Sequence, residues 1–215
     1  RRDFISHTSA IGGVLAIPGT PGIADLFKSV DEPWFDKSMR WAQLAFVEND
    51  PGRFDPDFWL DYFKRIHADG ALLSAGGIVA FYPTKIPLHH RSDWLADSNP
   101  LGYLIEGCRK MKMTIILRTD PHAVRQNVYD AHPEYISVLA NGEKRRHWAN
   151  KDLWVTCAYG PYNFEFMTKV NIEIMQMFKP EGIFSNRWSG HGVCYCESCK
   201  TNFRNSKGLE LPMTA

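Results

Sequence analysis

The chain has 215 residues, of which 44% are hydrophobic and 23% are charged, and its formal net charge is +1. This composition is typical of a globular protein that is long enough to bury a hydrophobic core. Because 25 basic residues are balanced by 24 acidic ones, the overall charge does not favour a nucleic acid or an anionic membrane surface as the partner. Small neutral ligands and protein partners fit this balance better.

The first residues have the pattern of an export signal. Two arginines open the chain, and they are followed by Phe4 and Ile5 and by a mildly apolar, Gly- and Ala-rich run over residues 10–17. This pattern resembles a twin-arginine leader, and its apolar run is too short to cross a bilayer as a helix. We therefore expect residues 1–30 to be a leader and residues 31–215 to form the domain, with no membrane span and a periplasmic or extracellular location.

The rest of the chain alternates apolar, strand-like runs with amphipathic helices. Asp55 is suited to cap the first helix, and Phe58, Tyr62 and Ile66 recur along it at helical spacing. A turn is expected at Asn141, which precedes a glycine inside a longer loop. In chain order, the expected elements are a strand at 41–50, a helix at 55–70, a strand at 70–84, a helix at 101–112, a strand at 113–123, a helix at 162–178 and a strand at 181–188.

Continuous apolar strands that alternate with helices indicate parallel pairing beneath the helices. Two architectures have this order, an open doubly wound sheet and a (β/α)₈ barrel. No strand is followed by a glycine-rich phosphate-binding motif, so a nucleotide-binding fold loses its main support. A complete barrel takes about 250 residues. We therefore expect an α/β fold of the (β/α)₈ TIM-barrel type, with only the N-terminal half to two-thirds of the barrel present.

Polar and charged side chains follow every expected strand, as they do at the C-terminal face of catalytic barrels. In chain order, they are Glu48, Asn49 and Asp50, then Tyr82, Lys85, His89 and His90, then Arg118, Asp120 and His122, and then Asn186, Arg187 and His191. Such groups can bind a hydroxyl-rich ligand and move protons. Solvated loop residues and local caps are the alternative, but a set that recurs after every strand favours a site. Arg118 and Asp120 should point the same way, because they alternate along a strand.

Three cysteines near the end of the chain, Cys194, Cys196 and Cys199, form a C-x-C-x-x-C run. Thiols separated by one residue rarely reach disulfide geometry, and a total of five leaves one over. A redox pair would need a thioredoxin-like setting that this chain lacks. Structural zinc is favoured, because it takes four ligands, with sulfur at about 2.3 Å. Cys157 is the best candidate for the fourth ligand, although a core cysteine would look the same, and Cys108 is expected to be a buried thiol.

Several segments together resemble one known family. They are GGIVAFYPTKIPLHHRSDWL (76–95), LRTDPHA (117–123), HPEYISVLANGE (132–143), TCAYGPYN (156–163) and GIFSNRWSGHGVCYCESCKTNFRNSKGLELP (182–212). The chain resembles the sixth of the hypothetical glycosyl hydrolase families, barrel proteins related to the β-galactosidases that carry a trimerisation domain. The resemblance extends from about Trp41 to Pro212.

In the β-galactosidase relatives, a C-x-C-x-x-C run after the fourth strand joins an earlier cysteine to hold structural zinc. The resemblance therefore implies zinc ligation by Cys157, Cys194, Cys196 and Cys199. The same relatives end their fourth strand with Asn-Glu, and the Glu is the general acid/base. Here the pair is Asn186 and Arg187. Arginine stays protonated and cannot exchange a proton at neutral pH. The nucleophile of these relatives follows their seventh strand, so its equivalent would fall beyond Ala215.

The resemblance implies a glycoside hydrolase that acts on a carbohydrate at the C-terminal face of the barrel. Asp120 and Glu48 are the candidates to replace the missing acid. A non-catalytic carbohydrate-binding or scaffold barrel, or an inactive fragment, is the alternative reading. Neither the sugar nor the formation of a homo-oligomer follows from the sequence. The expected substrate-binding residues are Tyr82, Lys85, His89, His90, Arg118, His122, Tyr159, Asn186, Arg187 and His191.

Overall fold

A computed structural model describes residues 33–188 and 192–213 of the chain. Within these residues, no helix has both the length and the apolar character that a membrane crossing requires. The expected leader, residues 1–30, lies outside the described part, so its assignment stays a prediction.

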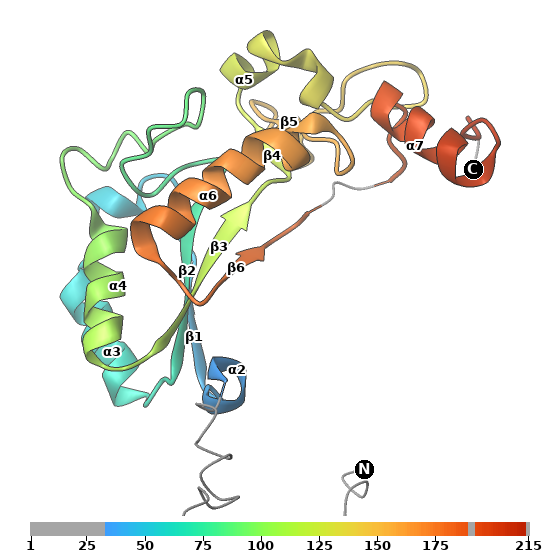
Figure 1. The fold of residues 1–215 in the computed structure, drawn as a ribbon. Coiled ribbons are helices and arrows are strands. Elements are labelled where there is room, and N and C mark those ends of the chain that lie inside the picture. The colour runs from blue at the N-terminus through green and yellow to red at the C-terminus, as the bar shows by residue number, and fades with distance from the viewer. Residues whose placement is uncertain (1–32, 189–191, 214–215) are drawn as a thin grey trace, which may run out of the picture. The chain divides into compact units, whose positions relative to one another are not determined.

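The main sheet has four strands that lie side by side in chain order (Figure 1). The strands are β1 (Trp41–Leu44), β2 (Gly70–Gly77), β3 (Thr114–Asp120) and β6 (Gly182–Ser185). All three pairings are parallel. A doubly wound sheet reverses its strand order at a switch point, whereas a barrel adds each strand beside the previous one. The observed order is therefore that of half a (β/α)₈ barrel.

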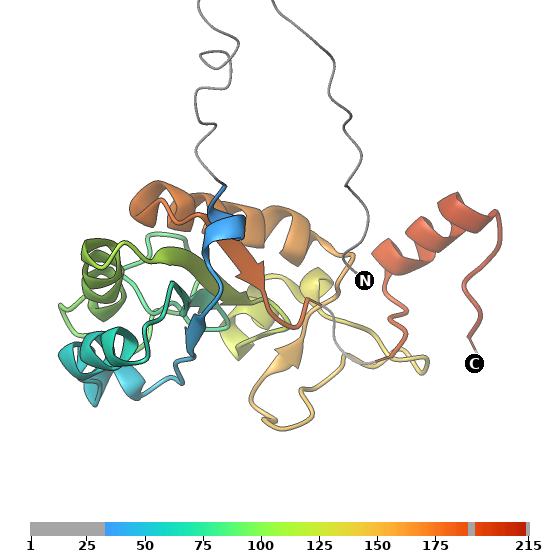
Figure 2. The same cartoon turned by 90° about the horizontal axis from the view of Figure 1, so that it is seen from below.

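The other main elements precede, connect or follow these strands along the chain. They are α2 (Trp34–Lys37), α3 (Pro56–Arg65), α4 (Pro100–Lys110), the two-residue strand β4 (Ala123–Val124), α5 (Gln126–Ala131), β5 (Trp154–Val155), a π-helical turn (Tyr162–Phe166), α6 (Met167–Phe178) and α7 (Glu197–Lys207). In Figure 2, α3, α4 and α6 form an arc around the outside of the curved sheet. This is the place that the helices of a barrel occupy.

Burial alternates along β3 and identifies the two faces of the sheet. Ile115, Leu117 and Thr119 are fully buried, whereas the residues between them are half-buried. Ile115 and Leu117 belong to the hydrophobic core that the sheet shares with the helices. Alternation places Arg118 and Asp120 on the opposite face, which lines the interior of a barrel. The sequence prediction that these two side chains share a face is confirmed.

Helix α3 begins as predicted, but a different stripe of it packs against the core. The side chain of Asp55 accepts hydrogen bonds from two backbone N–H groups of the first turn. Phe58, Tyr62 and Ile66, the stripe noted in the sequence, are 51%, 40% and 41% exposed, whereas Phe63 is buried. The helix therefore turns the stripe centred on Phe63 to the sheet. Helical spacing alone cannot choose between two adjacent apolar stripes.

A long excursion between β3 and α6 contains the predicted turn. Gly142 has φ +88°, and Val138 and Lys144 pair as an antiparallel bridge on either side of it. Further along, β5 pairs antiparallel with β4. The excursion therefore returns to the end of β3 and brings its own side chains there.

Candidate functional site

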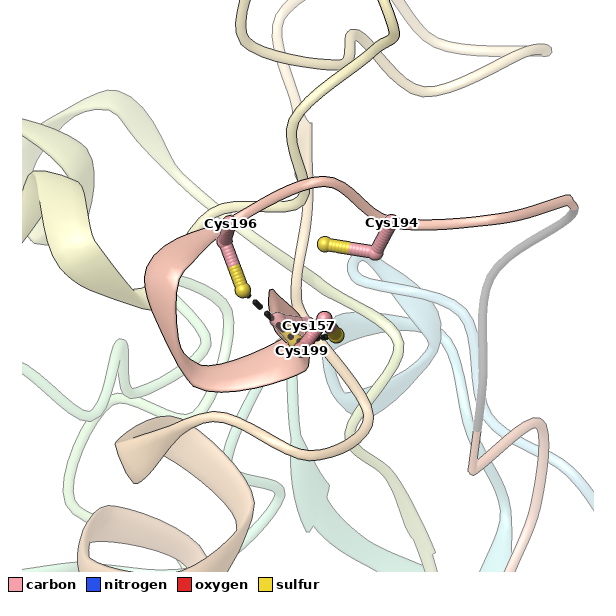
Figure 3. A group of neighbouring side chains, drawn as sticks. All are labelled: Cys157, Cys194, Cys196 and Cys199. Carbon is pink, nitrogen blue, oxygen red and sulfur yellow. Dashed lines mark hydrogen bonds between the residues drawn. The ribbon is translucent and has the colours of Figure 1, made fainter. Parts of the chain in front are cut away.

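Four cysteine thiols converge at the start of α7 (Figure 3). Cys157 follows β5, Cys194 and Cys196 precede α7, and Cys199 lies in the first turn of α7. The Sγ atom of Cys157 is 3.4 Å from the Sγ atoms of both Cys196 and Cys199. All four sulfur atoms lie within 4.8 Å of one another. The sequence prediction that Cys157 joins the C-x-C-x-x-C run is confirmed in position.

The spacing of the sulfurs fits a tetrahedral metal site. Four sulfurs at about 2.3 Å from a zinc ion would lie about 3.8 Å apart, within the range observed. Bonded sulfurs in a disulfide lie about 2.05 Å apart, and all five cysteines are free thiols. The fifth, Cys108, is buried in α4 as predicted.

The close contacts among the four thiols shift their pKa values in opposite directions, downward for Cys194 and Cys196 and upward for Cys157 and Cys199. The contact between Cys196 and Cys157 lowers the pKa of Cys196 to about 7. The contact with Cys157 is also the main cause that holds the pKa of Cys194 far below its usual range. The backbone N–H of Val138 donates to the Sγ atom of Cys194 at 3.4 Å. Such outer hydrogen bonds orient metal ligands.

A first group of polar side chains forms at the ends of β3 and β6. One oxygen of Asp120 accepts a hydrogen bond from Arg118 at 3.1 Å and one from the side-chain amide of Asn186 at 2.5 Å. The backbone N–H of Asn186 donates to the carbonyl of Thr119 at 2.7 Å, which continues the strand pairing. Asp120 is therefore held from both sides, and its side chain remains 25% exposed.

Aromatic rings lie beside this group. The ring of Trp148 stacks on His122 with 5.6 Å between centroids and on His147 with 3.9 Å. The guanidinium carbon of Arg187 lies 5.6 Å from the centroid of the Trp148 ring. Burial lowers the pKa of His122 to about 4, so this ring is neutral at pH 7. Together with Asp120, these residues form what we call the β3–β6 group: Arg118, Asp120, His122, His147, Trp148, Asn186 and Arg187.

A second group lies at the end of β1. The Oε1 atom of Glu48 is 2.9 Å from the Nε2 atom of His90, and it also pairs with Arg125. Burial raises the pKa of Glu48, but the hydrogen bonds from His90 and Arg125 outweigh it, and the net shift is downward. Glu48 is therefore a carboxylate at neutral pH in this arrangement, which suits a base or a charge partner and not a proton donor.

A polar cavity opens beside Glu48. Its volume is about 470 Å³, and most of its lining side chains carry hydrogen-bonding groups. They include Glu48, His90, Arg125, Gln126, Asn150 and Asp152. These residues come from the segments after β1, β2 and β4 and from the loop before β5. The cavity therefore lies at the ends of the strands, where the sequence predicted a site.

Three residues predicted to contact a ligand make hydrogen bonds within the fold. Tyr82 is fully buried, and its hydroxyl donates to Glu173 of α6 at 2.7 Å. The backbone N–H of Lys85 donates to the same carboxylate at 2.7 Å. His89 is 5% exposed, and its Nε2 atom accepts a hydrogen bond from the backbone N–H of Gly77 at 3.2 Å. Tyr82 and His89 therefore connect the loop after β2 to the helix layer and to the sheet, whereas the side chain of Lys85 is exposed. The assignment of these three residues to a ligand site stays a prediction.

The remaining predicted residues have different surroundings. Tyr159 is 62% exposed and lines a separate cavity of about 610 Å³ with Trp188 and Cys194. His191 lies outside the described residues. Asp50 accepts a hydrogen bond from the backbone N–H of Val47 at 2.6 Å and is a local cap.

The buried state of His89 makes stability depend on pH. Burial lowers the pKa of His89 to about 4, whereas the ring titrates near pH 6.5 when unfolded. The unfolded chain therefore binds this proton first, and the contribution of His89 to stability is complete above pH 6.5 and is lost between pH 6.5 and 4. As the pH is lowered through this window, we expect the free energy of unfolding to fall more steeply than in His89→Gln, by up to about 1.4 kcal/mol per pH unit.

Urea unfolding between pH 7 and pH 5 measures this difference in slope. His67→Gln is the control, because His67 is exposed. Equal slopes in the wild type and in His89→Gln would contradict the assignment.

Sequence reasoning missed two residues of the site, Arg125 and Trp148. Arg125 directly follows β4, a two-residue strand that is too short to give a periodic signal. Trp148 belongs to the excursion, which was expected to be only a loop with a turn. The run of basic residues just before Trp148 was the available signal, since a cluster of cations in a loop is a candidate for ligand binding.

Comparison with known proteins places the chain in a family. The model of the family described as hypothetical glycosyl hydrolase 6 matches residues 56–187, which is more than half of the chain. The chain belongs to this family. The predicted family is thereby confirmed. No curated protein sequence matches the chain significantly.

Solved structures with a similar fold include three bacterial proteins. Alpha-L-fucosidase isoenzyme 2 from Paenibacillus thiaminolyticus has a TM-score of 0.59 at 19% identity, and the match covers 80% of this chain and 27% of that one. The Thermotoga maritima alpha-fucosidase has a TM-score of 0.52 at 12% identity, with 81% and 49% covered. A hypothetical protein from Ruminiclostridium thermocellum has a TM-score of 0.51 at 12% identity, with 69% and 75% covered.

At these identities, the likeness to the three structures concerns the fold. This hypothetical glycosyl hydrolase 6 chain spans 27% and 49% of the two fucosidases. The likeness agrees with half a barrel and confirms the predicted TIM-barrel fold class.

Proposed function

We propose that this chain belongs to a glycoside hydrolase and binds carbohydrate at the ends of β1, β2, β3 and β6. The observation that carries the proposal is the polar cavity beside Glu48. A sugar has many hydroxyl groups, each of which needs a donor or an acceptor when it is bound. The cavity offers a carboxylate, an imidazole, a guanidinium group and amides within about 470 Å³.

Asp120 and Glu48 are the two carboxylates that we propose for the chemistry. Asp120 ends β3 on the inner face of the sheet, which is where barrel enzymes hold reacting groups. Its contacts with Arg118 and Asn186 occupy one oxygen. Glu48 is ionised and can stabilise positive charge that develops on a sugar ring. Arg187 has no proton-transfer role in this scheme.

A panel of aryl glycosides tests the proposal on the full-length protein. The panel includes aryl α-L-fucosides, because two proteins of similar fold are fucosidases. We expect at least one substrate to turn over, and we expect Asp120→Asn to lower kcat/KM by about 100-fold or more. Asp61→Asn is the matched control, because Asp61 is an exposed carboxylate on α3. Absence of turnover on every sugar, or full activity of Asp120→Asn, would contradict a catalytic role.

A barrel that binds carbohydrate without hydrolysing it is the second candidate. The observation that favours it is Arg187, which stands where the resemblance places a general acid, together with Arg partners on both candidate carboxylates. Calorimetry separates the two candidates, because the second predicts sugar binding with no turnover.

We also propose that Cys157, Cys194, Cys196 and Cys199 hold a structural zinc ion. The support is that the four sulfurs lie within 4.8 Å of one another, which is close enough for one ion. When bound, zinc would link the segment after β5 to the start of α7 without taking part in the reaction.

For residues 1–30, we propose a twin-arginine leader and export, supported by the sequence pattern alone. Fusion of this segment to a reporter that works only after export tests that assignment.

A further inference from the structure

Arg187 is unusual among the charged residues of the candidate site. Arg118 and Arg125 are each paired with a carboxylate. By contrast, the guanidinium group of Arg187 makes no ion pair and donates no hydrogen bond within residues 33–188 and 192–213. Its recorded contact there is the ring of Trp148. The site therefore contains one cation that the described chain does not neutralise.

The fold fixes where this cation is placed. β6 ends at Ser185, and the following Asn186 is bonded to β3 through its backbone and its side chain. Arg187 then has φ +52°, in the left-handed region that a non-glycine residue rarely adopts. Such a conformation persists where surrounding contacts determine it. This turn at Arg187 ends the strand β6 directly after Asn186, the residue that is bonded to Asp120. The ring of Trp148 lies within the distance of a cation–π contact from the Arg187 guanidinium group.

The balance of charge in the β3–β6 group is positive. Arg118 and Asp120 cancel each other, and Arg187 adds one positive charge. Burial lowers the pKa of His122 to about 4, so this ring adds no charge at pH 7. The Nδ1 atom of His122 is buried and has no hydrogen-bond partner in the described part of the chain. Buried polar atoms are normally satisfied, so a bound molecule is a candidate partner for this nitrogen.

We infer that the sugar bound at this site carries an anionic substituent, a carboxylate or a sulfate ester, which pairs with Arg187 above the ring of Trp148. The inference rests on the proposed function and names its substrate class. A guanidinium group donates two parallel hydrogen bonds to a carboxylate or a sulfate, and such charge-assisted bonds are about twice as strong as neutral ones.

Matched pairs of neutral and anionic sugars test this inference by calorimetry on the full-length protein. The pairs are methyl glucoside with methyl glucuronide, methyl galactoside with methyl galacturonide, and N-acetylglucosamine with its 6-sulfate. We expect an anionic member to bind about tenfold more tightly than its neutral partner. Added salt should reduce this preference, because it screens the charge. The carboxylate and sulfate pairs identify which anion is preferred.

Variants of Arg187 decide whether this residue causes the preference. Arg187→Gln should abolish the preference for the anionic sugar, and Arg187→Lys should retain part of it. Arg65→Gln removes an exposed charge of α3 and should change nothing. Equal affinity for neutral and anionic sugars, or a preference that survives Arg187→Gln, would overturn the inference and leave the proposed function standing. If no sugar of either kind binds, both fail.

Discussion

Replacing Cys157 with alanine is expected to remove zinc from the protein and to lower its free energy of unfolding by about 3 kcal/mol or more. Cys157 is the one thiol of the four that does not come from the segment around α7. Without it, the remaining three would lie within six residues of sequence and could no longer join distant parts of the chain. In isolated zinc-binding peptides, zinc contributes about 10–16 kcal/mol. A domain with its own core should lose only part of that amount.

Elemental analysis and urea unfolding, with and without a chelator, measure the two effects. Cys108→Ala is the control, because Cys108 is also buried but lies in α4 outside the cluster. This control should keep one zinc per chain and lose only about 1 kcal/mol through its small cavity. A wild-type protein without metal, or a chelator that leaves the unfolding curve unchanged, would refute the zinc assignment.

The order of strands and helices could be predicted because each strand is a continuous apolar run. A buried parallel strand needs such a run, and the polar residues that follow it mark its end. Asp120 illustrates the point, because it ends β3 as predicted and lies beside Asn186 at the end of the neighbouring strand. Spacing in the sequence is sufficient here, since parallel strands bring their C-terminal ends to the same edge of the sheet.

The roles of residues in the loop after β2 could not be predicted in the same way. Tyr82 and His89 follow the strand in sequence, but the loop turns back so that they contact Glu173 and Gly77. The acceptor for Tyr82 lies 91 positions away in the chain. No local pattern encodes such a partner. A polar residue after a strand therefore indicates the correct end of the sheet but not the direction of its side chain.

The same limit applies to the cluster of four cysteines and to the aromatic rings. The C-x-C-x-x-C run is a local motif, so three of the four converging thiols could be predicted from the sequence. The place of Cys157 depends on the excursion that pairs β5 with β4 and returns to the end of β3. Trp148 comes from the same excursion. The sequence of a long loop with two-residue strands shows little hydrophobic periodicity, so neither the position of Cys157 nor that of Trp148 could be predicted from periodicity.

Gly77→Ala is expected to lower the free energy of unfolding by about 3–4 kcal/mol and to disturb Asp120. Gly77 is aligned with Asp120 across β2 and β3, and its φ of +112° is in a region that residues with a Cβ rarely adopt. An added Cβ would overlap the backbone of Asp120, which has no room to yield within the sheet. The backbone N–H of Gly77 also donates to His89.

The end of β2 must therefore approach Asp120 more closely than any residue with a side chain allows. Gly142→Ala is the control for backbone strain. Gly142 also has a positive φ, +88°, but an added Cβ there would meet no neighbouring atom. We expect that control to cost about 1 kcal/mol and to retain whatever ligand binding or turnover the wild type has. Chemical unfolding of both variants, with ligand titration of each, measures the difference. Equal costs for the two substitutions would mean that the contact between Gly77 and Asp120 does not set the geometry of the strand ends.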